Sequence, residues 1–122
     1  MQITPDIVTT LRPDEVFVFG SNARGRHGGG AARVAYERFG AVWGEGHGHH
    51  GQSYAIDTMS GLDVLEREAR AFVAFAAEHP ELRFLLTPVG CGIAGYAPQQ
   101  VAGLFSGVPG NVAVPASFVP YL

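Results

Sequence analysis

The sequence predicts an α/β protein in three layers, with a mixed β-sheet flanked by helices on both faces. Short runs of apolar, β-branched and aromatic residues alternate along the chain with longer segments whose apolar residues recur at helical spacing. Glycine-rich segments between them favour turns that join strand to helix. A chain of 122 residues is long enough for one hydrophobic core, so we expect a single domain over residues 1–122.

Strands are predicted where short apolar runs end in glycine, proline or polar residues. The most regular run is Val16–Phe19, which Gly20 closes and which we expect to be buried on both faces of the sheet. Pro88 marks the point where a later strand stops pairing, because proline has no N–H to donate to a ladder. The predicted strands are residues 16–19, 53–58, 84–89 and 111–115.

Helices are predicted from apolar stripes with a spacing of three to four residues. Ser60 and Asp63 form a start signal for the longest of them, and Pro98 suits the first turn of another. The predicted helices run from Gly29 or Gly30 to Phe39, from Leu62 toward Pro80, and over residues 98–105. Residues 44–52 lack apolar periodicity and form a predicted loop.

Composition excludes several classes of function. All eight basic residues are arginine, so no mechanism with an amine side chain as nucleophile is available. The formal net charge of -3 does not favour extended duplex nucleic acid, although Arg24, Arg26, Arg33 and Arg38 form a local basic cluster. The single cysteine, Cys91, cannot form an internal disulfide. With no basic-then-apolar leader at its start and no long apolar run, the sequence predicts a cytoplasmic protein without a membrane partner.

Two glycine-rich loops, Gly20–Gly30 and Gly90–Tyr96, are the candidate binding elements. Each follows a buried strand, and ligands of parallel sheets bind outside the carboxyl ends of the strands, where such loops face one another. Gly28–Gly30 would let the backbone approach a ligand closely, and the free N–H groups of a helix start favour a phosphate. Glycine-rich turns also serve as ordinary tight connections, and neither standard phosphate-binding fingerprint is present. Composition alone leaves both interpretations open.

Three separated segments, residues 18–32, 51–56 and 87–96, give the sequence a more specific resemblance. Together with the closing segment 111–118, they resemble the bacterial and phage macro domain-like proteins, in the same order and over nearly the whole chain. The resemblance implies a macro domain fold that binds ADP-ribose or a related NAD-derived nucleotide across two loops, without a cofactor. The expected partner is ADP-ribose or an ADP-ribosylated target.

The resemblance also implies which residues hold the nucleotide. Ser21, Asn22 and Gly28 to Ala31 would contact the distal ribose and one side of the diphosphate, and the loop Gly90–Tyr96 would hold the other side. Tyr96 and Phe118 are candidates to stack on the adenine or ribose, but each also suits a core position. The expected ligand-binding residues are Phe19, Gly20, Ser21, Asn22, Gly28, Gly29, Gly30, Ala31, Gly90, Cys91, Gly92, Ile93, Ala94, Gly95, Tyr96 and Phe118.

Three residues are candidates for catalysis if the protein removes ADP-ribosyl groups. Asn22 matches the asparagine that orients the attacking water in hydrolytic macro domains; alternatively it caps the turn after the strand. His27 is a candidate acid or base, and alternatively only covers the helix start. Asp57 is a candidate proton acceptor in a substrate-assisted hydrolysis.

One catalytic route is excluded by the residues. Terminal ADP-ribose glycohydrolases of the macro domain class use a lysine after the middle strand and an aspartate in the second loop, and the matching places here hold Met59 and Ala94. The sequence therefore predicts a binding module, or alternatively a glycohydrolase without a lysine adduct. A metal protein that uses His47, His49 and His50 is a third alternative. We expect no metal and a solvated loop at the pocket rim, because a structural zinc usually needs four nitrogen or sulfur ligands.

Overall fold

The structure is a computed structural model that describes residues 2–122. Six strands form one sheet in the order β1-β6-β5-β2-β4-β3. Neighbouring strands are parallel except for β3 and β4, which are antiparallel. The predicted α/β class with a mixed sheet is therefore confirmed. The strands are β1 Ile3–Thr4, β2 Glu15–Ser21, β3 Gly48–His50, β4 Ser53–Asp57, β5 Arg83–Leu86 and β6 Val112–Pro115.

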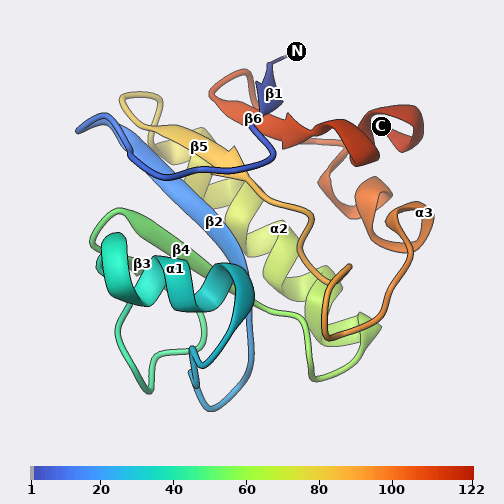
Figure 1. The fold of residues 1–122 in the computed structure, drawn as a ribbon. Coiled ribbons are helices and arrows are strands. Elements are labelled where there is room, and N and C mark those ends of the chain that lie inside the picture. Colours follow the sequence, from blue (N-terminus) through green and yellow to red (C-terminus); the bar gives the residue numbers. More distant parts are fainter. Residues whose placement is uncertain (1) are drawn as a thin grey trace.

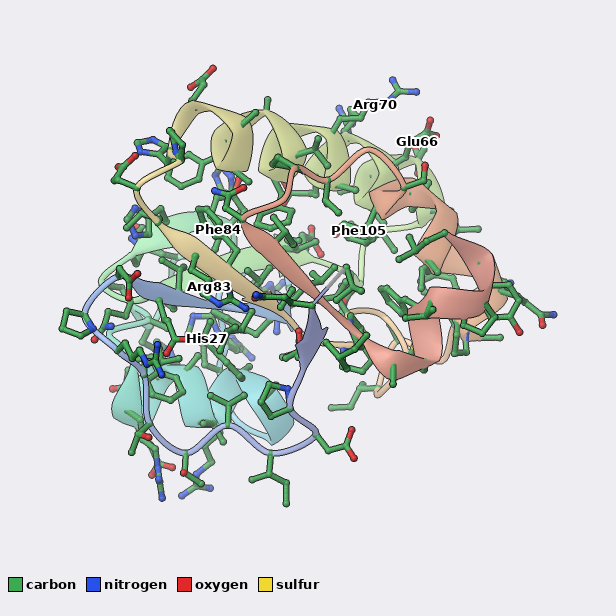
Figure 2. The ribbon with its side chains drawn as sticks, turned by 90° about the horizontal axis from the view of Figure 1, so that it is seen from above. His27, Glu66, Arg70, Arg83, Phe84 and Phe105 are labelled. Carbon is green, nitrogen blue, oxygen red and sulfur yellow. The ribbon has the colours of Figure 1, made fainter. Side chains whose placement is uncertain are left out.

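Helices cover both faces of this sheet. Figure 1 shows α1 in front of the central strands and α2 behind them, and Figure 2, seen from above, shows the sheet between these two helices. Among residues 2–122, no helix has the length and apolar character needed to cross a membrane. The helices are α1 Gly30–Arg38, α2 Leu62–Glu78 and α3 Pro98–Val101, with 3-10 helices η1 Ala102–Phe105 and η2 Ala116–Tyr121.

The alternation of side chains along β2 divides the core into two parts. Phe17 and Phe19 belong to a smaller cluster beneath α1, whereas Val16 and Val18 belong to a larger cluster beneath α2. Because both faces of β2 are buried, the run Val16–Phe19 is apolar throughout, as predicted. Burial on both faces fixes the position of this strand, and with it the position of the loop that follows Ser21.

Aromatic side chains fill the larger cluster. In Figure 2, Phe84 and Phe105 lie on the α2 side of the sheet, whereas His27 lies on the α1 side. Phe72 contacts both Phe84 and Phe105 in edge-to-face geometry, and the Phe118 ring stacks 6.0 Å from that of Phe105. This packing anchors α2 and the two 3-10 helices on the same face of the sheet.

The structure corrects several predicted boundaries. The predicted loop 44–52 contains β3, which pairs with β4 through main-chain hydrogen bonds, and such bonds need no apolar side-chain pattern. Ser60 does not cap α2: Gly61 is the N-cap, and the Ser60 hydroxyl donates to Asp57 instead. The predicted helix 98–105 is one α-helical turn continued by a 3-10 helix. The strand expected over 84–89 ends at Leu86, and β1 and η2 were not predicted.

Candidate functional site

A cavity of about 840 Å³ lies at the carboxyl ends of β2, β4 and β5. These strands are parallel neighbours in the order β5-β2-β4, so the loops that follow them leave the sheet at one edge. Both predicted glycine loops reach this cavity, together with the turn after β4. Its lining comprises Gly20–Arg24, Arg26, Gly29–Ala32, Thr58–Ser60 and Thr87–Ala94.

The first wall contains the start of α1. Gly29 is the N-cap and makes no side-chain capping hydrogen bond, and the next residues, Gly30 to Ala32, line the cavity. The first N–H groups of a helix have no intrahelical acceptor, so they are available to an anion. This wall therefore offers hydrogen-bond donors and the positive end of a helix dipole to the cavity.

The charged residues that line the cavity are Arg24 and Arg26, and both are exposed. Neither forms an ion pair with a described residue, and no described carboxylate lines the cavity. The predicted basic cluster is divided, since Arg33 pairs with Glu37 and Arg38 donates to a backbone carbonyl. The arginines that remain free at the cavity favour an anionic ligand.

Three glycines around the cavity are not required by the fold. A Cβ added at Gly28, Gly29 or Gly92 would meet no described heavy atom within 4 Å, and none of these residues has a positive φ. Gly29 and Gly92 line the cavity, so their missing side chains leave room inside it. No contact among the described residues requires glycine at these positions, so the backbone of Gly29 and Gly92 is open to close approach from the cavity.

Two other glycines of the same region are structural. A Cβ at Gly46 would lie 2.0 Å from the carbonyl oxygen of Asn22, and one at Gly25 would lie 2.3 Å from the nitrogen of Glu45. Gly25 also has a φ of 63°, in the left-handed region that favours glycine. The loop after β2 is thus packed directly against the backbone of Gly44–Gly46.

Asn22 holds the loop after β2 in shape. Its Nδ2 donates to the carbonyl of Arg26 at 3.0 Å, and its Oδ1 accepts from the N–H of Arg26 at 3.0 Å. This is the turn-capping role that the sequence left open as an alternative. Asn22 also lines the cavity, and one amide hydrogen and one lone pair remain available to a ligand.

His27 lies behind the cavity rather than in it. Its ring is 1% exposed and packs against Phe19, Tyr36 and Trp43. Its Nε2 lies 3.0 Å from the carbonyl oxygen of Val42, and its Nδ1 lies 3.5 Å from the Ser21 hydroxyl. Because His27 is buried and does not line the cavity, the structure gives it no direct contact with a ligand there. Of the residues that line the cavity, Ser21 is the one that the His27 ring approaches through a polar contact.

Asp57 also supports the site from outside. Its side chain is 7% exposed, and its carboxylate accepts from the N–H of Met59 at 3.0 Å and from the Ser60 hydroxyl at 2.6 Å. Both carboxylate oxygens are therefore used to hold the turn after β4. The cavity is lined by the turn that Asp57 holds, not by Asp57 itself.

Some of the expected ligand-binding residues lie elsewhere. Phe19 and Phe118 are fully buried in the two parts of the core, so neither ring is available to stack on a nucleotide. Tyr96 packs against the larger core and contacts Gly90. Gly28 and Gly95 flank the cavity without lining it. The expected residues that do line it are Gly20, Ser21, Asn22, Gly29, Gly30, Ala31, Gly90, Cys91, Gly92, Ile93 and Ala94.

The turn after β4 was not among the expected ligand-binding residues. Thr58, Met59 and Ser60 line the cavity, as do Thr87 and Pro88 after β5. The sequence could have indicated these residues by their position directly after predicted strands, because the carboxyl ends of parallel strands lie at one edge of the sheet. Met59 and Ala94 line the same cavity, so the two places matched to a catalytic lysine and aspartate do meet here without either group.

The histidines around β3 do not converge on one point. The His49 ring packs against Phe75, His50 approaches the carbonyl of His47, and His47 lies 4.0 Å from Glu68. Within residues 2–122, no group of three or more His, Cys, Asp or Glu side chains is placed to hold a metal ion. None of the three histidines lines the cavity.

A second depression of about 360 Å³ adjoins the first and shares Ala31, Thr87 and Pro88 with it. Its lining is mostly apolar, with Asp6 as its charged group. Thr4 also lines it, and the buried Thr4 hydroxyl oxygen has no hydrogen-bond partner among the described residues. The two depressions, here called the extended site, thus combine a part with two exposed arginines and a mostly apolar part.

Cys91 offers a chemical probe of the cavity that it lines. Burial raises the pKa of its thiol, so less of the reactive thiolate is present at neutral pH than in a free cysteine. We expect slow alkylation by iodoacetamide, at a rate that still rises with pH where a model thiol has levelled off. Mass spectrometry over a pH series measures this, and the unfolded protein serves as the control. Equal rates in the folded and unfolded protein would contradict the prediction.

Searches of protein-family models, curated proteins and solved structures found no match to this chain. The geometry of the site is therefore the basis for the functional proposal.

Proposed function

We propose that this chain binds ADP-ribose, or a related NAD-derived nucleotide, on a macro domain-like fold. The observation that supports this most is the pair of cavity glycines, Gly29 and Gly92, whose missing side chains leave room that the fold itself does not need. They lie on the two loops that the resemblance assigns to opposite sides of the diphosphate. A volume of about 840 Å³ also lies within the usual range for small-molecule sites.

The chemistry of the extended site agrees with such a ligand. In this proposal, the start of α1 and the guanidinium groups of Arg24 and Arg26 bind the diphosphate. The adjoining apolar depression takes the base, where Asp6 is placed to accept from an amino group. A nucleotide with a diphosphate between two unlike ends matches this arrangement better than a single phosphate does.

Binding is favoured over hydrolysis because each catalytic candidate already has a structural role. Asn22 holds the loop after β2, Asp57 holds the turn after β4, and His27 is buried behind Ser21. We therefore expect no turnover of ADP-ribosylated protein or DNA above the uncatalysed rate, measured by release of ADP-ribose. Turnover by the unmodified chain would instead establish the glycohydrolase alternative.

Isothermal titration calorimetry with ADP-ribose, NAD and AMP tests the proposal. We expect ADP-ribose to bind most tightly, since AMP lacks the second phosphate and the sugar beyond it. No heat of binding with ADP-ribose at millimolar concentration would overturn the proposed function.

A further inference from the structure

The last residue of β4, Asp57, has a backbone N–H that the described part of the sheet leaves without a partner. The N–H of the next residue, Thr58, donates to the carbonyl of Ser21 in β2, so the N–H of Asp57 points to the opposite side of the strand. β3 is the neighbour on that side, but its pairing with β4 begins only at Gly48, opposite Ala55. The ladder therefore ends before it reaches Asp57.

The chain turns away at the position where β3 would have to extend. Gly48 faces Ala55, so continuing the register by two residues would place Gly46 opposite Asp57. Gly46 instead packs against the loop after β2, where an added Cβ would lie 2.0 Å from the carbonyl oxygen of Asn22. The end of β4 thus needs an acceptor from elsewhere in the fold, because a partly buried N–H without one costs free energy.

Glu68 of α2 supplies this acceptor. Its Oε1 accepts from the N–H of Asp57 at 3.0 Å, and its side chain is 19% exposed. A hydrogen bond to a carboxylate is stronger than one to a neutral acceptor, and partial burial limits competition from water. The bond joins residues that lie 11 positions apart, so it closes a ring that contains the turn after β4 and the start of α2.

The side chain of Asp57 carries this restraint into the lining of the cavity. Its carboxylate accepts from the N–H of Met59 at 3.0 Å and from the hydroxyl of Ser60 at 2.6 Å, and both of these residues line the cavity. Glu68 itself does not line the cavity. Glu68 thus holds the backbone of Asp57, and Asp57 in turn holds the residues that a ligand would meet.

We infer that Glu68 is a positioning residue of the cavity, which fixes the turn after β4 in the place where it lines the site. The contact with Asp57, rather than the charge of Glu68, performs this role. His47 approaches the other carboxylate oxygen, Oε2, only to 4.0 Å and is 74% exposed, so that pair contributes little. The inference adds a residue outside the cavity to the proposed function, and it rests on that function for the identity of the ligand.

Three substitutions at Glu68 separate the contact from the charge. Glu68→Gln keeps the reach of the side chain and an acceptor oxygen but removes the charge, whereas Glu68→Asp keeps the charge but is one methylene too short. Glu68→Ala removes both, and the comparison of Gln with Asp carries the test if the alanine variant is too unstable to study. Glu66→Ala is the matched control, because Glu66 lies on the same helix, is also partly exposed, pairs with Arg70 and lies outside the cavity.

Amide hydrogen exchange, followed by NMR, tests the restraint without any ligand. In Glu68→Ala and Glu68→Asp, we expect the amides of Asp57 and Met59 to exchange roughly tenfold faster or more, since the acceptor is lost. In Glu68→Gln and Glu66→Ala, both amides should stay within about threefold of the unmodified chain. The Leu65 amide, which donates within the first turns of α2, should be unchanged in every variant. Unchanged exchange at Met59 in Glu68→Ala and Glu68→Asp would overturn the inference.

Calorimetry with ADP-ribose tests the consequence for binding. Glu68→Ala and Glu68→Asp should bind roughly three- to tenfold more weakly than the unmodified chain, and Glu68→Gln and Glu66→Ala should stay within about twofold. A variant that is only less stable keeps its affinity while it remains folded, so urea unfolding at the same temperature accompanies each titration.

Two binding results have different meanings. If Glu68→Ala and Glu68→Asp bind ADP-ribose as tightly as the unmodified chain, Glu68 does not position the site, and the proposed function stands. If ADP-ribose does not bind the unmodified chain, the proposed function fails, and the exchange at Met59 still decides whether Glu68 holds the turn.

Discussion

Replacing Gly29 and Gly92 together with alanine is expected to weaken ADP-ribose binding by roughly tenfold or more, because in the proposed complex each new Cβ enters the space that the nucleotide occupies. The fold should tolerate both changes, since neither Cβ meets a described atom within 4 Å and neither residue has a positive φ. Stability should stay within about 1 kcal/mol of the unmodified chain, and alanine can even stabilise by restricting the unfolded state. Calorimetry and urea unfolding measure the two effects.

Gly110→Ala is the matched control for this pair. Its Cβ also meets nothing within 4 Å, but Gly110 lies outside both depressions. It should change neither affinity nor stability by a measurable amount. Undiminished ADP-ribose affinity in the Gly29→Ala/Gly92→Ala variant would mean that the nucleotide does not approach this backbone.

Gly46→Ala, unlike the change at Gly29 and Gly92, is expected to destabilise the fold, by about 1–3 kcal/mol. Its Cβ would lie 2.0 Å from the carbonyl oxygen of Asn22 and 3.2 Å from that of Ala23, so the backbone of one loop must move. The movement should disturb the loop that Asn22 holds and thereby also weaken nucleotide binding. Urea unfolding followed through Trp43, the single tryptophan, measures the loss near this loop.

Gly107→Ala serves as the control here, because its Cβ meets no described atom and its φ is not positive. Gly25→Ala, with a Cβ 2.3 Å from the nitrogen of Glu45, should instead resemble Gly46→Ala. A Gly46→Ala chain as stable as the Gly107→Ala chain would show that the two loops are not packed as described.

The two kinds of glycine could not be separated in the sequence. Gly25, Gly28 and Gly29 lie within five residues of one another, yet Gly25 is required by a contact with Gly44 and Glu45, about twenty positions away. Gly28 and Gly29 have no such contact. Steric need at a glycine depends on neighbours that are distant in the chain, so only the folded arrangement distinguishes a structural glycine from one that leaves room for a ligand.

Local patterns were sufficient for the central strands and the two long helices. The run Val16–Phe19 is buried on both faces and is therefore apolar throughout. In α2, one buried face imposes a helical spacing on Leu65, Ala69, Phe72 and Ala76. Edge elements such as β1 and β3 bury little and rely on main-chain pairing, so they left no comparable pattern.

By itself, the sequence determined the α/β class, the central elements, and the two glycine loops as candidate binding elements, because periodicity and glycine content are local properties. The tertiary structure decided which residues of those loops face the cavity, and it moved Phe19, Phe118, His27 and Asp57 out of direct contact with it. It also brought Thr58, Ser60 and Thr87 into the lining of the same cavity as Ser21. These residues follow three different strands, whose carboxyl ends lie side by side only when the sheet forms.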